Sequence, residues 1–177
     1  MSTAIDLWIR DVRFEEREAA VELTIEAYKQ YEQGFSPEFW ENYKNSMRVL
    51  WSGEQVVDRI IAVQDGKLVG ALLLFPANFL LEKINVKLPY PELRLLAVDT
   101  SARGKGVATA LIRECALRAE KRGAPYLGLH TTERMASARK LYQRLGFQRV
   151  TEFDFPGEDK QTVVEAYRLP LGGELGF

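Results

Sequence analysis

A short segment that combines glycines with basic residues offers the clearest chemistry in this sequence. Arg103-Gly104-Lys105-Gly106-Val107-Ala108 follows a β-rich run over residues 92–98 and precedes a helical pattern. The first N–H groups of a helix lack intrahelical partners, and the helix dipole adds partial positive charge there. The two glycines let a ligand approach the backbone closely, and the arginine and lysine add full charges. The segment therefore predicts an anion site that fits a pyrophosphate.

Spacing argues against two familiar nucleotide motifs. A Walker A loop requires Gly-x-x-x-x-Gly-Lys-Ser/Thr, which the segment lacks. The dinucleotide motif requires a glycine or alanine three residues after its second glycine, and here Thr109 follows Gly106 at that distance. Taken alone, the segment is compatible with an ordinary helix start as well as with a phosphate site.

Composition limits the class of protein. The chain has 177 residues, of which 46% are hydrophobic and 28% charged, and its net charge is −1, which gives no argument for nucleic acid as a partner. One cysteine excludes an internal disulfide. The longest apolar run, 68–75, is too short to cross a membrane, and the first residues lack a signal-peptide pattern. We therefore expect one cytoplasmic domain over residues 1–177, without a membrane partner.

Periodicity and turn residues predict the elements that position this segment. Ser36-Pro37 is typical of a helix start, and Asp65-Gly66 between two β-rich runs is typical of a hairpin. Residues 77–91 are predicted as a long loop with room for a short strand. A mixed α/β sheet with helices on both faces satisfies the element order. The expected strands cover about 7–12, 59–64, 67–75, 92–98, 126–130, 147–155 and 162–169, and the expected helices about 16–33, 36–51, 107–122 and 135–145.

A second block, Ala-Arg-Lys-Leu-Tyr-Gln-Arg-Leu-Gly-Phe over residues 138–147, follows further along the chain. The two blocks together resemble the GNAT acetyltransferases, whose acetyl-CoA loop reads Arg/Gln-x-x-Gly-x-Gly/Ala and whose later signature reads Ala-x-x-Leu-Tyr-x-x-x-Gly-Phe. The resemblance is specific over about residues 92–150. It implies a GNAT-like fold with a central splayed mixed sheet, acetyl-CoA as the acetyl donor, and no metal.

The resemblance also implies where acetyl-CoA binds. The pyrophosphate would lie on the loop backbone, and the pantetheine arm would pair with the end of the strand over 92–98, as an added strand does. The thioester would lie beside the strand over 126–130. The implied cofactor residues are Leu96, Ala97, Val98, Arg103, Gly104, Lys105, Gly106, Val107, Ala108, Thr109, Ala138 and Tyr142.

Two residues are implied as catalytic. Tyr142 matches the tyrosine that commonly protonates the departing CoA thiolate, and a phenol with a pKa of about 10 is a neutral donor at pH 7. Glu92 opens the central strand, where some histone acetyltransferases of the superfamily place the base that removes the amine proton. The alternative for Tyr142 is a packed aromatic residue of its helix. The alternative for Glu92 is a solvated glutamate, with water as the base. The N–H of Val98 would hold the oxyanion.

Several other residues are weighed against simpler roles. Many family members have asparagine where this chain has Met135, so that CoA contact is lost or is replaced by His130, Thr131 or Ser137. His130 is the only histidine, which excludes a histidine-cluster metal site, and we expect it to be structural. Cys115 lies on the apolar stripe of its helix and is expected in the core.

An aromatic stripe marks the helix over 36–51. Trp40, Tyr43, Met47 and Trp51 recur at helical spacing, with Phe39 alongside. The stripe favours a core position or a subunit contact in a homodimer over an acceptor pocket.

The sequence thus predicts an acetyl-CoA-dependent N-acetyltransferase whose acceptor is a primary amine, either on a small molecule or on a peptide or protein. The alternative is a non-catalytic acyl-CoA-binding sensor or interaction module of the same fold. Nothing in the sequence identifies the acceptor.

Overall fold

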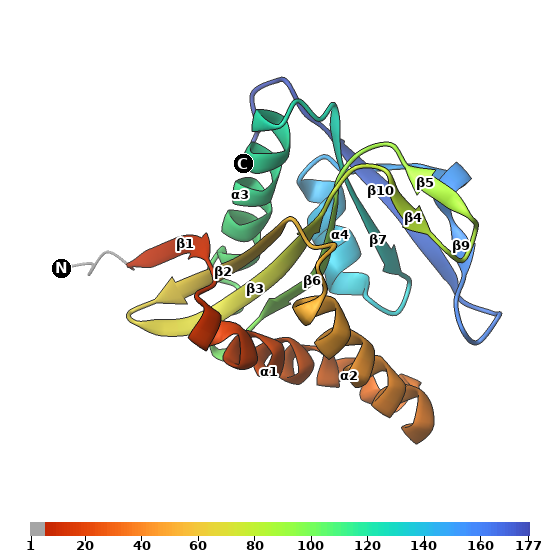
Figure 1. The fold of residues 1–177 in the computed structure, drawn as a ribbon, viewed down its shortest axis with the longest axis horizontal. Helices are drawn as coiled ribbons and strands as arrows, with labels where there is room; N and C mark the ends of the chain where they lie inside the picture. The colour runs from red at the N-terminus through yellow and green to blue at the C-terminus, as the bar shows by residue number, and fades with distance from the viewer. Residues whose placement is uncertain (1–5) are drawn as a thin grey trace. The chain divides into compact units, whose positions relative to one another are not determined.

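The computed structural model describes residues 6–177, whose helices and strands Figure 1 labels. The chain divides into two compact units. The first unit holds the chain up to Leu74 together with Leu95–Cys115. The second unit holds Phe75–Arg94 and Ala116–Phe177. A single domain over residues 1–177 therefore stays a prediction, and each unit is described by itself.

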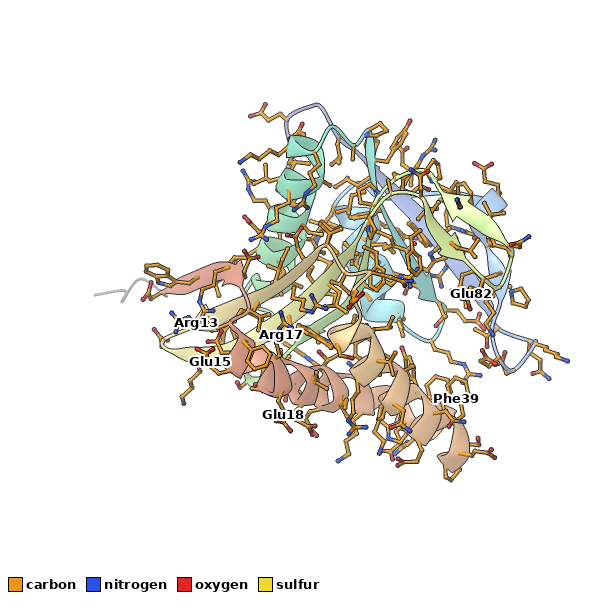
Figure 2. All side chains as sticks on the ribbon, viewed as in Figure 1. Arg13, Glu15, Arg17, Glu18, Phe39 and Glu82 are labelled. Carbon is orange, nitrogen blue, oxygen red and sulfur yellow. The ribbon has the colours of Figure 1, made fainter. Side chains whose placement is uncertain are left out.

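Two helices open the first unit. The expected helix over 16–33 is an α-helix, α1 (Arg17–Tyr28), between two 3₁₀ segments, η1 (Phe14–Glu16) and η2 (Lys29–Gly34). Helix α2 (Pro37–Ser52) begins as predicted, because the Ser36 hydroxyl accepts the N–H of Phe39 at 3.1 Å. Charged side chains of Arg13, Glu15, Arg17 and Glu18 surround the start of α1, as Figure 2 shows. Helices α1 and α2 pack against each other.

The strands of the first unit follow the order β1-β2-β3-β6. Strand β1 (Leu7–Asp11) pairs antiparallel with β2 (Asp58–Gln64), which pairs antiparallel with β3 (Lys67–Phe75). The predicted hairpin is confirmed: Asp65 and Gly66 both have positive φ, 49° and 77°, as a two-residue turn between twisted strands requires.

Strand β6 (Glu92–Val98) has the predicted bounds and passes from the second unit into the first after Arg94. Its end leads through Asp99, whose N–H bonds the Val69 carbonyl at 2.8 Å, into η3 (Thr100–Ala102) and then α3 (Val107–Lys121). Cys115 in α3 is fully buried, which confirms its core position. None of the helices in residues 6–177 is long and apolar enough to span a membrane.

The strands of the second unit follow the order β6-β7-β10-β8. Strand β7 (Tyr126–Thr132) pairs in parallel with β6 at Gly128 and Glu92, and antiparallel with β10 (Val163–Pro170). The sheet is therefore mixed, as predicted. Gly128 is required here by space, because a Cβ would lie 2.6 Å from the ring of Tyr90. Helix α4 (Ala136–Arg144) packs on β7.

The predicted strand over 147–155 is not continuous, although residues at both of its ends pair antiparallel with β10. The segment contains only β8 (Gln148–Arg149) and β9 (Phe155–Pro156), which flank a 3₁₀ turn, η4 (Thr151–Phe153). The Asp154 carboxylate accepts the Ala166 N–H of β10 at 2.8 Å and so takes the place of a backbone carbonyl. A side chain therefore bonds β10 where a continuous strand would pair.

The predicted long loop over 77–91 contains a hairpin of two short strands. Strands β4 (Phe79–Leu81) and β5 (Val86–Leu88) pair antiparallel. Their buried leucines, Leu81 and Leu88, pack with Tyr90 into a small core of the second unit. Packing of these side chains therefore holds the hairpin in its unit. The turn residues of the sequence alone do not predict this packing.

Candidate active site

The glycine-containing loop lies in the first unit and has the backbone that an anion site needs. Gly104 and Gly106 have φ of 72° and 81°, and an added Cβ would meet nothing within 4 Å at either position. Glycine is therefore required by the backbone conformation rather than by lack of space. The Gly106 carbonyl accepts the first helical bond, from Ala110 at 3.0 Å, and Val107 is buried. This arrangement leaves the loop backbone exposed at the start of α3.

The two basic residues of the loop differ in their surroundings. The Arg103 Nε donates to the Val98 carbonyl at 3.3 Å, and its Nη2 donates to the Ala27 carbonyl near the end of α1 at 3.4 Å. A cation at a helix C-terminus is favoured by the helix dipole. Lys105 is exposed at the tip of the loop. The guanidinium of Arg103 thus holds the loop to α1, which its place in the motif does not predict.

The expected pantetheine segment follows a strained residue. Leu95 has φ of +52° in the middle of β6, a conformation that costs a residue with a Cβ roughly 1–2 kcal/mol. Strain of this kind persists where the surrounding structure fixes it, and it gathers at functional sites. Leu96 and Val98 beyond it are half-buried, and Ala97 is buried. Sequence reasoning missed Leu95, because leucine carries no signal for a left-handed conformation.

A buried charge cluster forms in the second unit around Glu92. The Glu92 side chain is 4% exposed. Its Oε1 accepts from the Arg94 Nε at 2.7 Å, and its Oε2 lies 2.6 Å from the His130 Nδ1. We call Glu92, Arg94 and His130 the charge cluster. Sequence analysis named Glu92 and His130 separately, and it missed Arg94 entirely.

Both ring nitrogens of His130 are engaged. Its Nε2 lies 3.0 Å from the carbonyl oxygen of Phe153, and because a carbonyl only accepts, Nε2 carries a proton. Burial lowers the pKa of His130, but the hydrogen bond and charge of Glu92 outweigh burial, so the pKa is raised. Burial raises the pKa of Glu92, but His130 and Arg94 outweigh it, so that pKa is lowered. The pair is therefore favoured as imidazolium and carboxylate.

These contacts bear on the role that the sequence suggested for Glu92. A carboxylate with a lowered pKa and both oxygens engaged accepts a further proton less readily than a solvated one. The base role of Glu92 stays a prediction. His130, expected to be structural, is bound on both nitrogens.

The signature helix α4 carries Tyr142 on its buried side. Tyr142 is 6% exposed, and its ring centroid lies 5.6 Å from that of Phe147. Its backbone carbonyl accepts the Phe147 N–H at 3.0 Å, so the Gly-Phe end of the signature closes the helix. Ala138, on the same helix, is half-buried. The acid role of Tyr142 stays a prediction.

Met135 occupies the N-cap position of α4 without a side-chain cap. Of the three residues suggested to replace the usual asparagine, His130 is bound on both nitrogens and Ser137 is exposed. The hydroxyl of Thr131 is buried and has no hydrogen-bond partner within residues 6–177. Thr131 is therefore the residue of the three that retains an unused buried donor.

The aromatic stripe of α2 is mostly core. Trp40, Met47 and Trp51 are buried, which confirms the core interpretation for these three. Phe39 is half-buried and stacks on Phe35 at 4.5 Å between ring centroids. An acceptor pocket or a homodimer contact at the remaining aromatics stays a prediction.

Comparison with known proteins tests the resemblance directly. The sequence profile of the Acetyltransferase (GNAT) family matches residues 18–147, well over half of the chain. An N-acetylaspartate synthetase of Danio rerio is 42% identical over 94 residues. That match covers 47% of this chain and 33% of the synthetase, so the chain spans about a third of that relative.

Solved structures confirm the fold. A Corynebacterium glutamicum protein described as "histone acetyltransferase HPA2 and related acetyltransferase" has a TM-score of 0.71 at 19% identity, over 95% of this chain and 98% of that one. A Brucella melitensis GNAT family acetyltransferase in complex with acetyl-CoA has a TM-score of 0.62 at 17% identity, over 95% and 90%. The expected mixed sheet flanked by helices is thereby confirmed, and the chain belongs to the acetyltransferase (GNAT) family.

Proposed function

We propose that the chain transfers the acetyl group of acetyl-CoA directly to a primary amine and releases CoA. The observation that carries this proposal is the loop at the start of α3, where Gly104 and Gly106 hold positive φ and the backbone is exposed. The family profile covers this loop and the whole signature block over 138–147. A solved family member in complex with acetyl-CoA supports the donor.

The loop and the end of β6 are the proposed cofactor residues. N–H groups of Arg103 to Thr109 would bind the pyrophosphate, because groups at a helix start point toward a ligand without intrahelical partners. The backbone of Leu96 to Val98 would pair with the pantetheine arm. Lys105 would add a full charge near the phosphates, while Arg103 holds the loop in place.

The proposed reaction needs no covalent enzyme intermediate. The amine loses a proton, its nitrogen attacks the thioester carbonyl carbon, and the N–H of Val98 stabilises the resulting oxyanion. The C–S bond then breaks, and the Tyr142 hydroxyl protonates the departing thiolate. The amide nitrogen loses its remaining extra proton, which restores the Tyr142 hydroxyl. Water is the more suitable immediate acceptor of the amine proton, because the Glu92 carboxylate is already bound by Arg94 and His130.

The identity of the acceptor is a separate matter. The Danio rerio relative is named as a synthetase of N-acetylaspartate, which makes aspartate one reasonable member of a test panel. Because the match spans only a third of that protein, its substrate is no more than a starting point.

Thiol release with a panel of amines, with products identified by mass spectrometry, tests the proposal. We expect Tyr142→Phe to lower kcat about 10²–10⁴-fold, as loss of a general acid does, while acetyl-CoA affinity is kept. Tyr167→Phe, a buried tyrosine on β10, is the matched control and should leave kcat unchanged. Binding of acetyl-CoA without turnover of any amine would favour the sensor alternative, and absence of binding would refute the cofactor assignment.

A further inference from the structure

The guanidinium of Arg94 lies against a pair of aromatic rings in the second unit, Phe75 and Phe79, which contact each other edge to face with centroids 4.9 Å apart. Its Cζ lies 4.4 Å from the ring centroid of Phe75 and 4.7 Å from that of Phe79. Contacts at these distances attract a cation, and arginine stacks on aromatic faces more readily than lysine does. The two rings therefore help to hold the guanidinium in place before any ligand arrives.

Most donors of this guanidinium are unused. A guanidinium has five N–H donors, and that of Arg94 makes one hydrogen bond, from Nε to Glu92. Within residues 6–177, no acceptor bonds either Nη group of Arg94. The side chain is 22% exposed, so the outer edge of the fork is accessible. Two parallel N–H groups on such an edge match the two oxygens of a carboxylate.

The charges around Arg94 favour an incoming anion. Glu92 is the one carboxylate bound to Arg94 in the described chain, and it is shared with His130. The nearby Asp154 is committed to Arg149, with two contacts of 2.7 Å. The charge of Arg94 opposes protonation of His130, but the hydrogen bond and charge of Glu92 outweigh it, and the pKa of His130 is raised. With His130 protonated, the charge cluster carries two positive charges and one negative.

We propose that the free Nη edge of Arg94 binds a carboxylate of the acceptor, so that the enzyme selects anionic amines such as amino acids. The inference rests on the proposed function and names its substrate class. Glu92 and the two rings position the guanidinium, and Arg94 determines specificity. In the chain, Arg94 stands two residues before Leu96, the first residue of the proposed pantetheine segment.

The test compares acceptors that differ only in carboxylate against carboxamide. Aspartate with asparagine, glutamate with glutamine, and glycine with glycinamide are suitable pairs, assayed for CoA release and for acetylated product. A hydrogen bond to a charged group is worth enough to predict a kcat/KM ratio of about 10–100 in favour of the acid of at least one pair. The difference should reside mainly in KM.

Variants then assign the preference to Arg94. Arg94→Gln should bring the ratio close to one, and Arg94→Lys, which keeps the charge without the planar fork, should retain part of it. Arg10→Gln, a part-buried arginine paired with Glu16 in the first unit, is the matched control and should leave the ratio unchanged. Thermal unfolding of each variant checks that it folds. If Arg94→Gln does not fold, the proposal is tested by the kcat/KM ratio of the wild type and by the partial retention of that ratio in Arg94→Lys.

The outcomes separate the two proposals. If no amine is acetylated, the proposed function fails. If amines are acetylated but both members of every pair react equally, or if the ratio survives in Arg94→Gln, the role of Arg94 is overturned and its guanidinium serves only to balance Glu92.

Discussion

The loop over 103–108 and the charge cluster are built in opposite ways. The loop is exposed, and its shape comes from backbone dihedral angles at two glycines. The charge cluster is mostly buried, and its shape comes from side chains that belong to two strands and lie up to 38 positions apart. One is a local property of the sequence, and the other exists only once the chain has folded.

This contrast teaches how each region tolerates change. A backbone site depends on the residues that permit its conformation and little on the identity of the others. A buried cluster depends on every partner, because removing one leaves the others charged and desolvated. The predictions below test this difference, beginning with the largest expected effect.

Glu92→Ala should cause the largest loss of stability. It leaves His130 and the half-buried Arg94 without their carboxylate, and breaking a buried ion pair costs about 3–5 kcal/mol in the free energy of unfolding. Glu158→Ala is the control, because its pair with Lys83 is exposed on both sides and such pairs contribute about 0–1 kcal/mol. If chemical denaturation gives equal losses in the free energy of unfolding for the two variants, the charge cluster is no more strongly coupled than a surface ion pair.

Replacing both loop glycines should act on binding. In Gly104→Ala with Gly106→Ala, each alanine at positive φ costs roughly 1–2 kcal/mol, together about 2–4 kcal/mol, so we expect acetyl-CoA affinity to fall about 30–1,000-fold. Gly66→Ala is a matched control in the same unit, with φ of 77° and open space around an added Cβ. It should lower stability without changing affinity. An affinity loss in Gly66→Ala as large as that of the loop variant would remove the special role of the loop.

The pH dependence of stability should show the smallest effect. The raised pKa of His130 stabilises the fold below its ordinary value of 6.5, and this is lost as the pH rises through the raised value. The lowered pKa of Glu92 stabilises the fold above 4.5, and this is lost as the pH falls through the lowered value. The charge cluster should therefore stabilise most between about pH 4.5 and 6.5.

Denaturation of the wild type and of His130→Gln across pH 5–9 measures this contribution. The advantage of the wild type should shrink as the pH rises. Because His130 is the only histidine in the chain, its titration by NMR can be followed without assignment. A constant advantage, or a pKa at or below 6.5, would contradict the imidazolium–carboxylate pair.

The same contrast explains what the sequence could predict. The helix after the loop starts at Val107 as expected, and the hairpin at Asp65-Gly66 and strand β6 also match, because turn residues and periodicity are local signals. The break at 151–153 was missed because the Asp154 carboxylate replaces a backbone partner of β10, a contact no spacing reveals.

In the candidate site, the sequence identified the residues that lie in motifs but not the residues that contact them in the fold. The sequence marked the loop and Tyr142 because both lie in contiguous blocks. It singled out Glu92 and His130 without their contact, and it missed Arg94 altogether, because an arginine in a strand has no distinctive pattern. The left-handed conformation of Leu95 could not be predicted for a similar reason, because the surrounding structure imposes it.

Calorimetric titration with acetyl-CoA tests the central claim most directly, namely that the loop binds the cofactor while the charge cluster faces the acceptor. The account predicts binding of one acetyl-CoA per wild-type chain, at least a tenfold loss in the double glycine variant, and an affinity within about twofold of wild type in Arg94→Gln. Absence of binding in the wild type, or an equal loss in Arg94→Gln and the glycine variant, would contradict it.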